Sequence, residues 1–249
     1  MDRQRFYRQI QTRGDLLGFE VRYRESDLHI RAERALPDEA SASLIRHRNA
    51  VEGYIRSRPE FGESLIPLAD DPLAPRLVRN MLESAAAAEV GPMAAVAGAI
   101  AEAVGRELLE TCGEVIVENG GDLFVACAHD IVAGLYAGSS PLSHRIGLKI
   151  RAEDMPLGIC TSSRTVGHSL SLGRADAACV VADNSALADA CATALGNRIG
   201  ESSDIERALD WVCSIDGVRG GLVILSETMG ILGDIEIANL DESIEEQPT

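Results

Sequence analysis

The sequence predicts an α+β fold in which antiparallel sheets carry packed helices, and three observations support this class. The 249 residues are 46% apolar, enough to bury a substantial core. Short strand-like runs follow one another with only tight turns between them, which implies antiparallel pairing. Segments with helical apolar spacing flank these runs and would pack on one face of the sheets.

The N-terminal part begins with a hairpin and a helix. Residues 18–34 alternate apolar and polar side chains around Glu25-Ser26-Asp27, which predicts two strands with one buried face. Residues 37–58 predict a helix because Pro37 opens it, acidic residues occupy its first turn and arginines lie near its end.

An acidic, proline-flanked segment at residues 67–75 is the best candidate for an internal boundary. We therefore expect residues 1–70 to form a hairpin-and-helix portion and residues 71–240 a core, the two packed as one unit. Residues 241–249 form an acidic tail that we expect to be disordered.

The core predicts helices and strands in a mixed order. Helices are expected at residues 77–89, 91–111, 185–197 and 203–213, and strands at 114–118, 122–127, 131–136, 145–150, 157–161, 177–182, 221–225 and 230–237. The helix at 91–111 is rich in alanine and includes Gly98 and Gly105, so little side-chain bulk covers its surface. Such a surface allows close approach, either of neighbouring backbone or of a ligand.

Charge restricts the partners. A formal net charge of -16 and a pI near 4.7 argue against nucleic acid and anionic membranes, which require a dense cationic surface. Small molecules are therefore the expected partners. Lys149 is the only lysine, so anion recognition would depend on arginine, backbone amides or a metal.

The remaining compositional features predict a cytoplasmic protein. The six cysteines show no C-x-x-C spacing and lie mostly in apolar runs, which predicts reduced thiols in the core. The N-terminus lacks the apolar core of a signal peptide, and no apolar run approaches the roughly 20 residues that span a bilayer.

The first candidate site is the segment Glu118-Asn119-Gly120-Gly121-Asp122 between two predicted strands. Paired glycines allow positive φ angles and leave room for a ligand to touch the backbone. The alternative is an ordinary hairpin turn, which Asn-Gly favours by itself.

The second candidate is the polar segment after the strand at 157–161. Thr161, Ser162, Ser163 and Arg164 concentrate hydroxyls, amides and a guanidinium where a phosphate could be held. The alternative is a solvated polar loop. His168 follows closely and could orient a substrate or transfer a proton near neutral pH, although a structural histidine is the alternative.

The third candidate lies on the helix at 185–197. Asp189 and Thr193 are four residues apart and share a face, in surroundings that are nearly all apolar. An oxygen pair of this kind suits Mg²⁺, with water and phosphate completing the octahedron. Alternatively, the pair forms the solvated edge of the helix.

The order of these motifs resembles the ApbE superfamily. Its members are similar in having K-G-x-x-x-D in a small-residue helix, then N-x-G-G-D, T-S-G, a histidine and a D-A-x-x-T helix, and the similarity covers residues 91–233. The resemblance implies an ApbE-like, T-fold-like α+β fold. It also implies that Asp189 and Thr193 bind Mg²⁺, and that residues 119–122 and 161–163 line a cleft for FAD or FMN.

The chain departs from the family pattern at several positions. Ala97 replaces the lysine before Gly98, Glu102 takes the place of the aspartate, and no D-P-x-T-G stretch follows His168. Because T-fold enzymes hold a purine or pterin ring through a glutamate, Glu118 or Glu102 is a candidate for that role.

Two functions follow from this resemblance. The first is a Mg²⁺-dependent flavin-nucleotide enzyme, a FAD pyrophosphatase or an FMN transferase with an unidentified acceptor protein, in which Asp189 and His168 act in catalysis. The second is a non-catalytic module or assembly factor that binds a nucleotide, pterin or flavin. A homo-oligomer is a third expectation, because T-fold-like sheets associate edge to edge.

Overall fold

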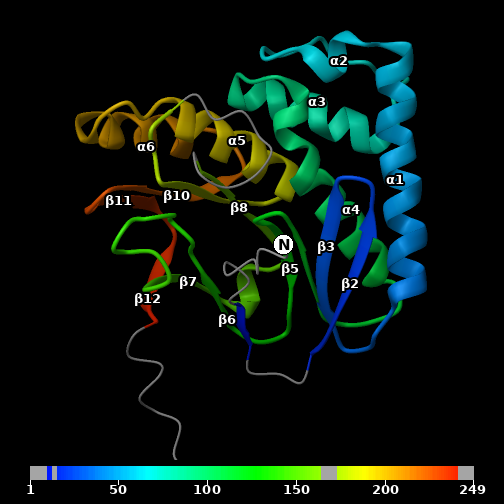
Figure 1. Cartoon of the computed structure of the whole chain (residues 1–249), viewed down its shortest axis with the longest axis horizontal. Coiled ribbons are helices and arrows are strands. Elements are labelled where there is room, and N and C mark those ends of the chain that lie inside the picture. The colour runs from blue at the N-terminus through cyan, green and yellow to red at the C-terminus, as the bar shows by residue number, and fades with distance from the viewer. Residues whose placement is uncertain (1–9, 13–15, 164–172, 241–249) are drawn as a thin grey trace, which may run out of the picture.

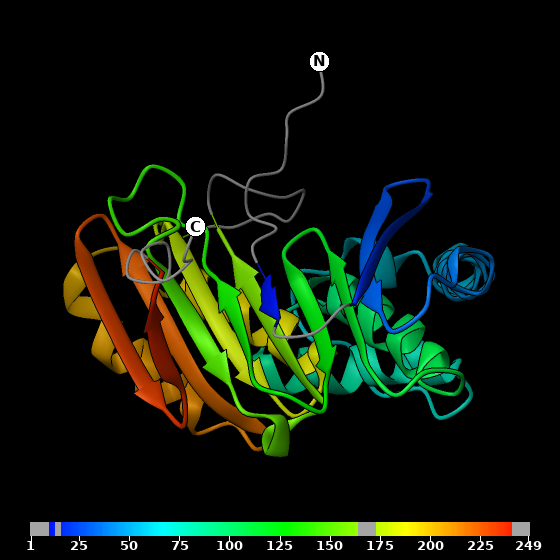
Figure 2. The same ribbon diagram turned by 90° about the horizontal axis from the view of Figure 1, so that it is seen from below.

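The computed structural model describes residues 10–12, 16–163 and 173–240. Within them, two antiparallel sheets lie face to face and the helices lie along one side of the sheets (Figures 1 and 2). The larger sheet has the order β11-β10-β9-β8-β5-β4-β3-β2, and the smaller one has the order β1-β6-β7-β12. This arrangement confirms the predicted α+β class with antiparallel sheets and packed helices.

In the described part of the chain, the larger sheet contains eight strands. They are β2 (Leu17–Tyr23), β3 (Ser26–Ala32), β4 (Val115–Asn119), β5 (Asp122–Ala126), β8 (Leu157–Ser162), β9 (Ala177–Ala182), β10 (Val218–Leu225) and β11 (Thr228–Gly233). The smaller sheet comprises β1 (Ile10–Thr12), β6 (Ile131–Gly134), β7 (Ile146–Ile150) and β12 (Glu236–Asn239).

The helices begin and end close to the predicted residues. They are α1 (Pro37–Ser57), α2 (Glu60–Glu63), α3 (Arg76–Ala88), α4 (Val96–Leu108), α5 (Ser185–Asn197) and α6 (Ile205–Cys213), with 3₁₀ turns at Pro92–Ala95, Ala152–Asp154 and Ser202–Asp204. The single helix predicted at 91–111 is therefore a 3₁₀ turn followed by α4. Of the described helices, none alone combines the length and apolar character of a membrane span; α3 and residues 92–108 meet that test only together, across a bend of 107°.

Two apolar cores lie on opposite faces of the larger sheet. One fills the space between this sheet and the helices, and the other fills the space between the two sheets. Alternation along each strand divides side chains between them, as on β4, where Val117 faces the helices and Ile116 faces the smaller sheet. Residues on both sides of the predicted boundary at 67–75 contribute to the helix-side core, and the division at residue 70 stays a prediction.

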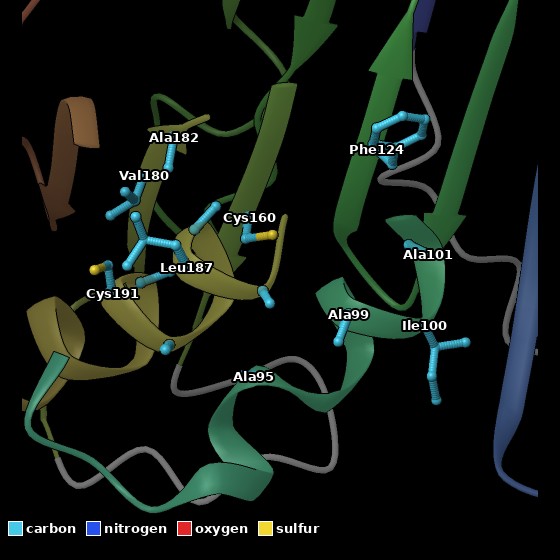
Figure 3. Close-up of a cluster of buried hydrophobic side chains, with 14 of the residues drawn as sticks. Ala95, Ala99, Ile100, Ala101, Phe124, Cys160, Val180, Ala182, Leu187 and Cys191 are labelled. Carbon is cyan, nitrogen blue, oxygen red and sulfur yellow. The ribbon is translucent and has the colours of Figure 1, made fainter. Parts of the chain in front are cut away.

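The beginning of α5 is held between α4 and β8. A Cβ atom added at Gly98 of α4 would lie 2.1 Å from the Ser185 carbonyl oxygen, and one added at Gly158 of β8 would lie 2.4 Å from the Ser185 Cα. Small side chains such as Ala95 and Ala99 line this contact (Figure 3). Close backbone packing therefore explains Gly98 within the small-residue helix.

One predicted strand is wrong in its extent. The strand expected at 230–237 is two strands in different sheets, β11 and β12, because the chain turns at Gly233. Gly233 has a φ of 96°, and a Cβ atom there would lie 2.4 Å from the Arg219 carbonyl oxygen, so glycine alone fits the turn. The acidic tail predicted at 241–249 lies outside the described residues.

Candidate functional site

The paired glycines form a two-residue hairpin between β4 and β5. Asn119 and Asp122 are the last paired residues, and Gly120 and Gly121 have φ angles of 72° and 117°. Positive φ at both central residues matches the turns that join twisted antiparallel strands. A Cβ atom added at Gly120 would have no heavy atom within 4 Å, so the turn also leaves its outer surface open.

The predicted site residues of the strands are divided between the two faces of the larger sheet. Asn119 faces the helices, where its Nδ2 donates a hydrogen bond to the Ala97 carbonyl oxygen at 3.1 Å. Glu118, Thr161 and Ser163 line a pocket on the opposite face. Strand alternation therefore separates neighbouring motif residues into a helix side and a pocket side.

On the helix side, Asp189 is buried within α5 with 7% of its surface exposed. Its Oδ2 accepts a hydrogen bond from the Gly98 amide at 2.9 Å. Burial and the nearby Asp122 carboxylate raise the pKa of Asp189 well above its usual value, while the amides of Gly98 and Ala97 oppose that shift. The solvated-edge interpretation of Asp189 is wrong, because only 7% of its surface is exposed.

Asp122 is the second carboxylate of this region. It lies directly opposite Cys160 of β8 across the strand pair. Asp122 keeps part of its surface exposed, but desolvation of its carboxylate within the fold raises its pKa to about 7. Glu118 contributes to the rise, while hydrogen bonds from Cys160 and the Thr161 backbone oppose it. Among the described residues, no arginine or lysine pairs with Asp122 or Asp189. The two interacting carboxylates therefore require a proton or a cation between them.

The helix side offers two oxygen donors, Asp189 and Thr193, that a hard cation could use. Thr193, also 7% exposed, follows Asp189 by one helical turn and adds a hydroxyl oxygen. In the described part of the chain, no group of three or more His, Cys, Asp and Glu residues is placed to hold a metal. Magnesium commonly binds through one or two carboxylates and completes its shell with water and phosphate, so a sparse set of this kind suits it.

Glu102 has both carboxylate oxygens occupied within the fold. Oε2 accepts a hydrogen bond from the Ser185 amide at 2.6 Å, and Oε1 accepts one from Arg106 Nε at 2.7 Å. The carboxylate thus binds the first turn of α5, where amides are otherwise unpaired. Its observed contacts hold α4 against α5.

On the pocket side, the described residues form a hollow between the two sheets. Its lining comes from β4, the glycine turn, β5, β8 and the end of β6, and comprises Glu118, Gly120, Gly121, Leu123, Ala133, Gly134, Leu135, Tyr136, Ile159, Thr161 and Ser163. Counting the solvent at its mouth, the empty space is about 600 Å³. The Tyr136 ring at this pocket lies 5.1 Å from the His144 ring, centroid to centroid.

The pocket contains residues that sequence reasoning missed. The strand carrying Ala133 was predicted, but its place in a second sheet above β4 and β5 was not, so Tyr136 was not connected with the glycine turn. The aromatic residue at the end of the strand predicted at 131–136 would have been the available signal. Arg164 and His168, predicted to bind phosphate and to act in catalysis, lie outside the described residues.

Lys149 lies in β7, where its Nζ is 3.4 Å from Glu236 Oε1. It lines a second hollow between the sheets, which shares no lining residue with the pocket at the glycine turn. The sole lysine therefore contributes to a different part of the fold.

The cysteines match the prediction of reduced core thiols. All six are free, and five of them are buried, with Cys213 partly exposed. Burial raises the pKa of the Cys160 thiol well above its usual value, so the neutral thiol persists beside Asp122.

Comparisons with known proteins agree with this architecture. A family model described as "AbpE bacteria" matches residues 8–221. A UPF0280 protein of Methanococcus aeolicus is 41% identical over 82% of this chain and 85% of its own length, and one from Methanosarcina acetivorans is 40% identical over 85% of each chain.

Solved structures resemble the whole fold at low identity. The flavinyl transferase ApbE of Pseudomonas stutzeri in its apo form matches 94% of this chain and 98% of its own, with a TM-score of 0.55 and 11% identity. The ApbE protein of Thermotoga maritima matches 94% of this chain and all of its own, with a TM-score of 0.53 and 11% identity. With the family model covering most of its length, the chain belongs to the "AbpE bacteria" family, in a diverged branch together with the uncharacterised UPF0280 proteins.

Proposed function

We propose that this chain binds a flavin nucleotide, FAD or FMN, together with Mg²⁺, and acts as a FAD pyrophosphatase or as an FMN transferase. Membership of the ApbE-like family and the likeness to flavin transferase structures support a flavin-related function. The observation that carries the metal assignment is the pair of interacting carboxylates, Asp122 and Asp189, which has no cationic partner among the described residues.

In this proposal Asp189 and Thr193 bind the metal, and Asp122 adds negative charge beside it. The amides of Gly98 and Ala97 fix the Asp189 carboxylate, and Asn119 fixes the Ala97 carbonyl in turn. Bound Mg²⁺ would neutralise charge on the phosphates. The protein's contribution is a rigid, water-poor position for that ion, held by main-chain groups of α4.

The nucleotide would extend around the glycine turn. The pocket between the sheets would take the ring system, with Tyr136 beside it and the hydroxyls of Thr161 and Ser163 as hydrogen-bonding groups. The open surface at Gly120 would let the phosphates pass from the pocket side to the helix side. Glu102 does not contact the ligand in this proposal, because both of its carboxylate oxygens already accept hydrogen bonds within the fold.

The test measures release of FMN and AMP from FAD with and without Mg²⁺. We expect Asp189→Asn to abolish the Mg²⁺-dependent release while keeping a hydrogen-bond acceptor for Gly98, and Thr193→Val to reduce it. Asp183→Asn is the matched control, because that carboxylate is exposed and pairs with Arg219 at 2.7 Å. Unchanged release in Asp189→Asn would contradict the metal assignment.

The second candidate function is a non-catalytic module or assembly factor that binds a nucleotide, pterin or flavin. It is favoured by Ala97, which stands where the family has lysine, and by Lys149, which lies at a different hollow. Under this alternative, a flavin or pterin raises the melting temperature without turnover. A cytoplasmic location and an acceptor protein for FMN stay predictions.

A further inference from the structure

The connection between β6 and β7, residues 135–145, forms one wall of the pocket at the glycine turn. Leu135 and Tyr136, at its beginning, line that pocket. The Leu135 amide donates a hydrogen bond to the Ile146 carbonyl oxygen at 2.9 Å, and the His144 amide donates one to the Leu135 carbonyl oxygen at 3.0 Å. The two ends of the connection therefore lie side by side at the pocket.

The middle of this connection is bound to the turn between β10 and β11. Ser140 is buried, and its Oγ donates a hydrogen bond to the Ser226 carbonyl oxygen at 2.6 Å. The Ser226 amide in turn donates one to Asp176 Oδ2 at 2.6 Å. Within the connection itself, the Ala137 amide donates a hydrogen bond to Ser143 Oγ at 3.0 Å. These contacts fix the connection, so its side chains have defined positions at the pocket.

His144 has a backbone conformation that is unfavourable for a residue with a side chain. Its φ is 63°, in the left-handed region that glycine adopts without penalty. Of the described residues other than glycine, Arg24, Glu89 and Ser226 also have a positive φ. Each of these lies in a two-residue hairpin turn or at a helix end, where this conformation is common. His144 lies in neither, although glycine would fit its backbone better.

The side chain of His144 packs against the ring of Tyr136. The two ring centroids are 5.1 Å apart, and the ring planes are inclined by 52°. Aromatic rings at this separation attract each other beyond the gain from burial alone. Unfavourable backbone conformations persist where the side chain that they place has a use, and they are concentrated at ligand sites. Here the conformation places a ring against a residue of the pocket wall.

We propose that His144 is a positioning residue that fixes the orientation of the Tyr136 ring at the pocket. Under the proposed function, on which this inference rests, that ring contacts the ring system of the flavin. His144 does not line the pocket, so it acts through Tyr136. Its ring and its backbone then have separate effects: the ring favours ligand binding, and the left-handed backbone lowers the stability of the fold.

Variants at His144 separate these two effects. His144→Gly and His144→Asn remove the ring, and both new residues accept a positive φ. We expect each to bind FMN roughly threefold more weakly in a fluorescence titration, yet to melt at the wild-type temperature or up to about 4 °C above it. His144→Phe retains a ring and should bind like the wild type, but it should melt at a lower temperature because a bulky residue enters the left-handed region.

Combination with Tyr136→Ala tests whether His144 acts through Tyr136. In that background His144→Gly should not weaken FMN binding further, because the ring that His144 positions is absent. Ser139→Ala is the matched control, since Ser139 is exposed in the same connection, and it should leave binding unchanged. If His144→Gly binds FMN like the wild type, or weakens binding equally with and without Tyr136, the proposal is overturned.

A measurement without ligand separates this proposal from the proposed function. In the full chain labelled with fluorotyrosine, the fluorine NMR signal of Tyr136 is assigned by its loss in Tyr136→Phe. This signal should move in His144→Gly and His144→Asn, which lack the neighbouring ring, and an unmoved signal would overturn the proposal. If the signal moves but the wild type binds no FMN, the proposed function is wrong, whereas the positioning of Tyr136 by His144 is supported.

Discussion

The helix side and the pocket side of the larger sheet meet at the same glycine turn, yet they are built by different means. On the helix side, buried main-chain and carboxylate groups fix one another at short distances, as in the contact of Gly98 with Asp189 at 2.9 Å. On the pocket side, side chains from two sheets surround a hollow that opens to solvent. Substitutions on the helix side should therefore affect folding and metal binding together, and substitutions on the pocket side should affect ligand binding alone.

The largest effect should come from filling the contact between α4 and α5. Gly98→Val would place a Cβ atom 2.1 Å from the Ser185 carbonyl oxygen, so the helices must separate. We expect a loss of about 3 kcal/mol or more in the free energy of unfolding, measured by urea denaturation.

Gly53→Ala is the matched control on α1, where the nearest heavy atom to a new Cβ is a flexible arginine nitrogen at 3.7 Å. This variant should be neutral or gain up to about 1 kcal/mol. Equal stability of the two variants would mean that the helix side is not tightly packed.

The next effect is a pH dependence that only the helix side should show. The folded-state pKa of Asp122 is about 7, above its ordinary 3.8, so the folded protein binds more protons than the unfolded chain between these values. Stability without metal should fall by a few kcal/mol as pH rises from about 4 to 7. Asp189, whose pKa is also raised, contributes in the same direction.

Urea denaturation at pH 5 and pH 8 measures this difference. We expect Asp122→Asn to reduce it and Mg²⁺ to restore stability at pH 8, because a bound cation favours the ionised carboxylates. If the pH dependence of stability were identical in the wild type and in Asp122→Asn, the ionisation of Asp122 beside Asp189 would not be its cause.

The division between the two sides also explains which parts could be predicted. Local patterns predicted α5 at residues 185–197, the hairpin of β2 and β3, and most strands, because apolar periodicity and turn residues depend on neighbours in sequence. The turn at Gly120 and Gly121 was predicted for the same reason. The sequence alone could not distinguish a turn that leaves room for a ligand from an ordinary hairpin turn.

Long-range pairing could not be predicted from such patterns. Periodicity does not show which sheet a strand joins, so the smaller sheet and the place of Tyr136 at the pocket were missed. The electrostatic interaction of Asp189 with Asp122 depends on how closely α5 packs on β8. Glycines such as Gly158 permit that close packing, but their presence in the sequence does not predict it. The strand predicted at 230–237 continued through Gly233 because a single glycine is compatible with either a strand or a turn.

A smaller and more specific effect is expected on the pocket side. Tyr136→Ala should weaken binding of a flavin about tenfold through loss of an aromatic contact, without changing the Mg²⁺ concentration that supports binding or the stability at pH 8. Tyr136→Phe keeps the ring and should bind like the wild type. Fluorescence titration with FMN measures both variants, and a weaker response to Mg²⁺ in Tyr136→Ala would show that the two sides are not independent.

The smallest effect should come from Lys149→Ala. Its ion pair with Glu236 spans 3.4 Å and both side chains are substantially exposed, so its loss should cost no more than about 0.5 kcal/mol. Ala97 stands where the family has a lysine that would face the phosphates, and Lys149 lies too far away in the fold to take over that role. FAD turnover by Lys149→Ala should therefore stay at the wild-type level. A clear loss of turnover in Lys149→Ala, measured at saturating Mg²⁺, would instead show that the second hollow takes part in the reaction. The helix side and the pocket at the glycine turn would then not account for the whole site.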